Sequence, residues 1–111
     1  MSRARLLLLC PGQGDQHPDM FNLARTSGAA SSLLDQLAVR AEGDIFANRN
    51  AQPLIVAATL GMWEAVRDFA PTPALVAGYS IGELSAYGVA GAITPEQAVT
   101  LAAQRAQWMD D

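Results

Sequence analysis

The sequence contains no lysine, so its positive charge comes from arginine alone. The seven basic residues are dispersed from Arg3 to Arg105, and the eleven acidic residues are equally scattered, for a net charge of −4. A nucleic-acid-binding surface needs a basic stripe, commonly interleaved with aromatic residues. Neither pattern is present, so the sequence predicts no nucleic-acid partner.

Cysteine is also scarce, because Cys10 is the single one. An intrachain disulfide and a cysteine-built metal site are therefore excluded. Cys10 ends the apolar run Leu6–Leu9, which predicts a buried strand thiol. The same run is too short for a signal peptide or a membrane span, and Pro11-Gly12 breaks it at once. We expect a cytoplasmic protein that has no membrane segment.

What the sequence does contain is a serine between two glycines, in the run Ala77-Gly78-Tyr79-Ser80-Ile81-Gly82-Glu83. The run follows a short apolar stretch and precedes a helix-like one, which is the sequence form of a nucleophile elbow. Glycine on both sides lets neighbouring backbones come close, because glycine carries no Cβ. The pattern predicts that Ser80 is a nucleophile that faces the first N–H groups of the next helix.

A serine nucleophile needs a base, and histidine occurs only once, at His17. His17 lies in a polar loop between Asp15 and Asp19. A triad of Ser80, His17 and an aspartate is one interpretation of these residues. A solvated surface histidine is the ordinary case in such a loop, so we expect the base to lie elsewhere.

Apolar spacing predicts a mixed α/β chain with few strands. Continuous apolar runs predict a strand over 5–10, covered on both faces, and a short strand over 74–77. Helical periodicity and start signals such as Pro53 and Thr94 predict helices within 20–42, broken near Ser27-Gly28, and over 52–70, 81–89 and 95–109. This order favours a parallel sheet. Two strands make a poor independent sheet, so we expect missing strands to come from elsewhere.

A second motif, Pro11-Gly12-Gln13-Gly14-Asp15-Gln16, directly follows the first strand. Strand exits in a parallel sheet share one edge, where ligands bind, so this loop and Ser80 are expected to lie close together. The loop is either a plain strand-exit turn or a backbone that donates an N–H to the serine site. It lacks the Lys-Ser/Thr ending of a phosphate-binding loop.

Together these motifs resemble the malonyl-CoA:acyl-carrier-protein transacylase family. The shared features are P-G-Q-G-x-Q after a strand, Ala51-Gln52-Pro53 opening a long helix, G-x-S-x-G-E, and an arginine in the following helix. The resemblance covers nearly all 111 residues. It implies that residues 1–111 are the N-terminal part of an α/β-hydrolase-like, parallel-sheet subdomain of an acyltransferase. The catalytic histidine and a small ferredoxin-like subdomain are then expected beyond residue 111.

The resemblance also implies roles for five residues. Ser80 matches the acylated nucleophile, and the backbone N–H groups of Gln13 and Ile81 match the oxyanion hole. Gln52 matches a glutamine that lines the site, and Arg105 matches the arginine that pairs with the free carboxylate of a malonyl group. The implied donor is malonyl-CoA and the implied acceptor is a phosphopantetheine-type thiol on an acyl-carrier protein, with no metal and no bound cofactor.

Two residues depart from the family pattern. Tyr79 stands where histidine is most common, and Asp15 replaces a smaller residue. The G-Y-S-x-G-E-L form, with Asn48–Pro53, looks most like the malonyltransferase subunit of malonate decarboxylase, whose other subunits would then be partners. The alternatives are a fatty-acid or polyketide transacylase, a serine esterase or thioesterase, and a non-catalytic interaction module.

Overall fold

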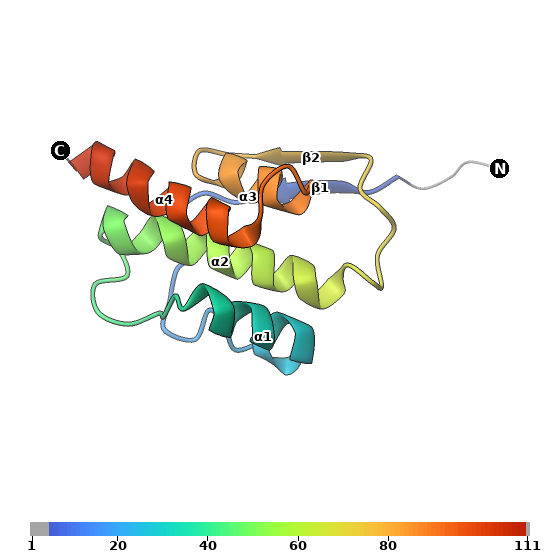
Figure 1. Ribbon diagram of the computed structural model, residues 1–111, viewed down its shortest axis with the longest axis horizontal. Helices are drawn as coiled ribbons and strands as arrows, with labels where there is room; N and C mark the ends of the chain where they lie inside the picture. Colours follow the sequence, from blue (N-terminus) through green and yellow to red (C-terminus); the bar gives the residue numbers. More distant parts are fainter. Residues whose placement is uncertain (1–4, 111) are drawn as a thin grey trace.

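A computed structural model describes residues 5–110, which form a two-stranded sheet with helices packed beside it (Figure 1). The helices and strands follow the predicted order, in which each strand precedes a group of helices. In chain order they are β1 (Leu7–Cys10), the 3-10 helix η1 (Ala24–Thr26), α1 (Gly28–Leu37), α2 (Asn48–Val66), β2 (Leu75–Gly78), α3 (Gly82–Val89) and α4 (Pro95–Asp110).

The two strands pair in parallel, as predicted. Their register aligns Leu7 with Leu75 at one end and Cys10 with Gly78 at the other. The carboxyl ends of both strands therefore lie level with each other. In Figure 1 this edge lies at the same side of the molecule as the start of α2 and the end of α4.

One face of the sheet is open, which contradicts the prediction that the first strand is covered on both faces. Side chains alternate between the faces of a strand, and the register puts Leu7, Leu9 and Leu75 on the same face. Their exposed fractions are 53%, 69% and 60%. Cys10, on the opposite face, is 2% exposed. The helices of residues 5–110 pack against that opposite face alone, so the run of leucines is only half buried.

Helix α2 runs through the centre of the molecule, with α1 on one side and α4 on the other (Figure 1). Leu54 and Ala57 face the core shared with α1, whereas Val56 and Leu60 face the core shared with α3 and α4. Gly61 packs against α1, where an added Cβ would lie 3.2 Å from Leu34. This contact brings α2 and α1 close together at a residue that has no Cβ.

The bounds of α2 differ from those predicted. The helix begins at Asn48, four residues before Gln52, because the N–H groups of Asn50 and Ala51 already donate to the carbonyl oxygen of Ala47. Pro53 consequently lies inside the helix rather than in its first turn. The helix ends at Val66 instead of residue 70.

Capping side chains define the starts of α1 and α4, at the predicted break near Ser27 and at the predicted start signal Thr94. Ser27 has an extended backbone that separates η1 from α1, and its Oγ accepts the Ala30 N–H at 3.3 Å. Thr94 and Gln97 form a reciprocal capping box, with backbone-to-side-chain distances of 2.9 and 3.1 Å.

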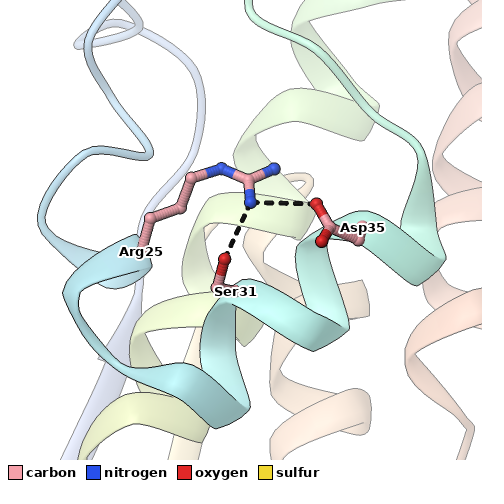
Figure 2. A network of polar contacts seen from close by, with 3 residues as sticks. All are labelled: Arg25, Ser31 and Asp35. Carbon is pink, nitrogen blue, oxygen red and sulfur yellow. Dashed lines mark hydrogen bonds and ion pairs between the residues drawn. The ribbon is translucent and has the colours of Figure 1, made fainter.

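A polar network on the surface fastens η1 to α1. Figure 2 shows Arg25 Nη1 donating to both Ser31 Oγ and Asp35 Oδ1, each at 3.0 Å. The ion pair is exposed, and exposed pairs stabilise a fold by about 1 kcal/mol at most. This network therefore orients the two elements more than it holds the fold together.

Candidate active site

The serine lies in a tight turn between β2 and α3, as the glycine pattern predicts. Its φ is 55°, a left-handed value that is uncommon for a residue with a side chain and that costs free energy. Both flanking glycines are required by close packing. A Cβ on Gly78 would lie less than 3.0 Å from the backbone of Gly82, and a Cβ on Gly82 would collide with the carbonyl of Cys10.

Hydrogen bonds hold the serine turn in place, and two backbone N–H groups, one in this turn and one in the loop after β1, stay free among the described residues. The Tyr79 N–H donates to the Cys10 carbonyl at 3.1 Å, and the Glu83 N–H donates to the Ser80 carbonyl at 3.0 Å. Within residues 5–110, the backbone N–H groups of Gln13 and Ile81 have no protein acceptor. Free N–H groups from two loops beside an exposed serine suit a developing oxyanion.

The loop after β1 packs against the serine turn. An added Cβ on Gly12 would lie 3.2 Å from both the ring and the carbonyl oxygen of Tyr79, and 3.7 Å from Ser80 Cβ. Gln16, which is buried, holds the loop from within: its Oε1 accepts the Gly14 N–H at 2.8 Å, and its Nε2 donates to the Ile45 carbonyl at 3.2 Å. The loop is therefore more than a strand-exit turn, because it packs beside Ser80 and Gln16 holds its conformation.

Arg105 reaches the serine from α4. Its Nη2 donates to Ser80 Oγ at 3.4 Å, and its Nη1 donates to Gln52 Oε1 at 2.8 Å. Gln52 is fully buried at 0% exposed, so the guanidinium is held by a rigid partner. In the described part of the chain no carboxylate forms an ion pair with Arg105. Its charge is thus directed at the space beside Ser80.

Three further polar partners at this edge were not assigned a role from the sequence. Gln13 Nε2 donates to Asn48 Oδ1 at 3.3 Å, and Asn48 Nδ2 donates to Asp110 Oδ1 at 3.0 Å. Gln52 Nε2 lies 3.2 Å from Met109 Sδ. The available signal for Asn48 was its position one helical turn before Gln52, which places both side chains on one face.

The histidine and the cysteine stay outside this cluster. His17 is exposed in a turn, and within residues 5–110 its side chain makes no hydrogen bond to Ser80. Burial raises the pKa of the Cys10 thiol, which keeps it protonated and unreactive. Residues 5–110 hold no group of three metal-ligating side chains, and none of their helices is both long and apolar enough to span a membrane.

The cluster therefore combines an exposed hydroxyl, two free backbone donors and a fixed cation. A hydroxyl beside free N–H groups is the arrangement that acyl transfer requires. A guanidinium beside the hydroxyl adds a binding place for a second, anionic group, since its planar fork matches a carboxylate. The base that would take the serine proton is not among these residues.

Comparisons with known proteins agree with this geometry. Residues 22–111 match a family described as the acyl transferase domain. The chain is 40% identical over 115 residues to a malonyl CoA-acyl carrier protein transacylase of Mycobacterium tuberculosis (strain ATCC 25618 / H37Rv). The match covers 90% of this chain and 38% of that protein. The chain thus spans well under half the length of this relative.

Solved structures of similar fold carry related descriptions. One is an acyl-carrier-protein S-malonyltransferase from Burkholderia pseudomallei 1710b, with 28% identity and a TM-score of 0.85 over 94% of this chain and 38% of that one. Another is a malonyl-transacylase in complex with its type II PKS acyl-carrier protein. It has 26% identity and a TM-score of 0.85, and the match covers 96% of this chain and 39% of the other.

Proposed function

Because the chain belongs to the acyl transferase domain family, we propose that it supplies the nucleophile and the carboxylate-binding arginine of a malonyl-CoA:acyl-carrier-protein transacylase. In this proposal residues 1–111 are the N-terminal portion of a hydrolase-like subdomain. The rest of that subdomain supplies further strands and the catalytic histidine, and a small ferredoxin-like subdomain completes the enzyme.

One observation carries the proposal: Arg105 contacts Ser80 Oγ while Gln52 fixes its other nitrogen. A malonyl group has a thioester carbonyl at one end and a free carboxylate at the other. Ser80 can attack the thioester carbonyl while the Arg105 guanidinium binds the free carboxylate. A simple ester has no carboxylate for Arg105 to bind, so the serine esterase alternative leaves this pair unexplained.

The reaction proceeds in two acyl transfers. Ser80 Oγ attacks the thioester carbon of malonyl-CoA, an O–C bond forms, and the C–S bond breaks. The serine proton passes to the base and then to the departing CoA thiolate. A phosphopantetheine thiol on the carrier protein then gives its proton to the same base and attacks the seryl ester. Its S–C bond replaces the O–C bond, and Ser80 recovers its proton.

In both steps negative charge develops on the carbonyl oxygen. The free N–H groups of Gln13 and Ile81 are our candidates for the donors that stabilise it. Removing one such donor typically costs about 2.7–4 kcal/mol of transition-state stabilisation. Because Ile81 directly precedes α3 and Gln13 follows β1, this oxyanion hole joins two segments far apart in sequence.

Covalent labelling tests the nucleophile. Full-length protein incubated with radiolabelled malonyl-CoA should retain one label per chain, and a Ser80→Ala variant should retain none. Equal labelling of both proteins would refute Ser80 as the nucleophile, and the absence of label from both would favour the alternative of a non-catalytic interaction module. Label that transfers to water rather than to an added carrier protein would favour a thioesterase.

A substrate comparison tests the arginine. Arg105→Ala should lower kcat/KM for malonyl-CoA by about 100-fold or more, the scale of a lost charge-assisted pair in an active site, and leave acetyl-CoA little changed. Arg40→Ala, at another exposed arginine, is the matched control and should change neither rate. An equal loss with both substrates would rule out the carboxylate-binding role.

A malonate decarboxylase subunit is the second candidate, favoured by Tyr79 beside the serine and by the Asn48–Pro53 sequence. The two candidates differ in acceptor. A fatty-acid or polyketide enzyme should malonylate a free-standing acyl-carrier protein, whereas a decarboxylase subunit should prefer the prosthetic thiol of its own complex. Parallel transfer assays with both acceptors distinguish them.

A further inference from the structure

We propose that Asn48 is a positioning residue, which holds the loop carrying Gln13 in register with the arginine helix α4. The proposal rests on the proposed function, since it assigns Gln13 N–H to the oxyanion hole. The one observation behind it is that a single side chain bridges three elements: the loop after β1, the first residue of α2, and the last turn of α4.

The polarity of this bridge is fixed by chemistry. Asp110 carries a carboxylate, which only accepts hydrogen bonds, so it must face the Nδ2 donor of Asn48, at 3.0 Å. The Oδ1 acceptor of Asn48 is then turned to Gln13, whose Nε2 donates at 3.3 Å. Both ends of the Asn48 amide are engaged, and no other residue type of this size both accepts and donates in this way.

Asn48 acts in parallel with Gln52. The two residues lie four apart on α2, and each reaches α4: Gln52 bonds Arg105, and Asn48 bonds Asp110. The bond from Gln52 positions the Arg105 guanidinium. Asn48, which bonds Asp110, also accepts the hydrogen bond from the Gln13 side chain. Asn48 thereby sets the Gln13 loop relative to the same helix that carries Arg105.

The Gln13 loop has two attachments to the segment 45–48. Gln16 bonds the Ile45 carbonyl from a buried position, and Gln13 bonds Asn48 from the exposed side. Loss of Asn48 leaves the buried attachment intact. The expected consequence is a misplaced Gln13 N–H in a protein that still folds, because the exposed links to Asn48 contribute little to stability.

The test is a single-turnover measurement of Ser80 acylation in the full-length protein. Asn48→Ala should slow acylation by about tenfold, since small misplacements of catalytic donors have effects of this order or larger. The loss should be equal for malonyl-CoA and acetyl-CoA, because the oxyanion hole serves any acyl group. The melting temperature should change little. Arg105→Ala, by contrast, should affect malonyl transfer selectively.

Rescue separates positioning from general damage. Asn48→Asp should be slow as well, because it removes the donor and sets two carboxylates against each other. Adding Asp110→Asn to it reverses the donor and acceptor while keeping the same side chains, and it should restore acylation to within about twofold of wild type. A double variant as slow as Asn48→Asp would overturn the proposal, and so would an Asn48→Ala variant with wild-type acylation.

Failure of the underlying function has a different signature. If the wild-type protein forms no seryl ester at all, the transacylase proposal falls and the role of Asn48 falls with it. If wild type and Asn48→Ala form the ester at equal rates, only the role of Asn48 is overturned. A loss confined to malonyl-CoA would also overturn it, since that would place Asn48 in carboxylate binding rather than in the oxyanion hole.

Discussion

Two regions around the small sheet differ: the carboxyl edge of its strands is well packed, whereas one of its faces is uncovered. At the carboxyl edge of the strands, side chains from four elements form two hydrogen-bonded chains. One joins Gln13, Asn48 and Asp110, and the other joins Ser80, Arg105 and Gln52. On the open face of the sheet, Leu7, Leu9 and Leu75 are exposed and contact no layer within residues 5–110. The polar site is organised within this chain, whereas its hydrophobic layering is not.

The difference follows from the range of the forces. Hydrogen bonds and close backbone packing at the site involve single pairs of atoms, and the described residues provide both partners. Hydrophobic stabilisation grows with the area removed from water, about 25 cal/mol per Å² of apolar surface, so it needs a whole opposing layer. A site can therefore be ordered beside a sheet whose apolar side chains are buried on one face only.

The largest expected effect concerns the open face. Residues 1–111 in isolation should bind the dye ANS and lack a single cooperative melt, because a two-stranded sheet with an exposed apolar face is marginal in water. The full-length protein should melt cooperatively. Circular dichroism melts and ANS fluorescence check both. A cooperative melt of the isolated chain without ANS binding would show that the open face needs no cover.

Next in size is the close packing at the serine turn. Gly82→Ala in the full-length protein should destabilise the fold by at least about 3 kcal/mol, because the new Cβ meets the backbone of Cys10 rather than a flexible side chain. Denaturant unfolding measures this change. Gly28→Ala is the control, since no atom lies within 4 Å of its Cβ position and alanine favours the helix. Equal effects at the two glycines would contradict the packing.

A smaller effect is expected inside the polar cluster. Gln52→Leu should cost about 1–3 kcal/mol of stability, the penalty for leaving a partner such as the Arg105 guanidinium unsatisfied in a partly buried place. Malonyl transfer should fall together with stability. Gln104→Leu, at an exposed position of α4, should change neither quantity. A neutral Gln52→Leu variant would mean that Arg105 is held by other contacts.

The smallest effect is expected at the surface network of Figure 2. Arg25→Ala should reduce the free energy of unfolding by about 0.5 kcal/mol, because the pair with Asp35 is exposed. The difference should shrink in 1 M salt, where charges are screened over about 3 Å. Chemical denaturation with and without salt measures it. A loss of several kcal/mol would indicate that η1 supports the core more than its burial suggests.

Much of the fold was predictable because its signals are local. The serine turn, the break at Ser27 and the capping box at Thr94 each depend on residues within a few positions of one another. The start of α2 was not, because Pro53 is a start signal that also fits inside this helix. The partners of Asn48 were not either, since Gln13 and Asp110 lie 35 and 62 residues away.

The sequence by itself determined the chemistry of this protein: a serine in a glycine-flanked turn, a Gly-Gln-Gly loop after a strand, and arginine as its only strong cation. These are properties of short segments, where residue type dictates backbone conformation. Only the tertiary structure decided which of them meet. Arg105 contacts Ser80, His17 does not bond it, and Asn48 joins loop to helix, because helix packing sets distances that no local spacing contains.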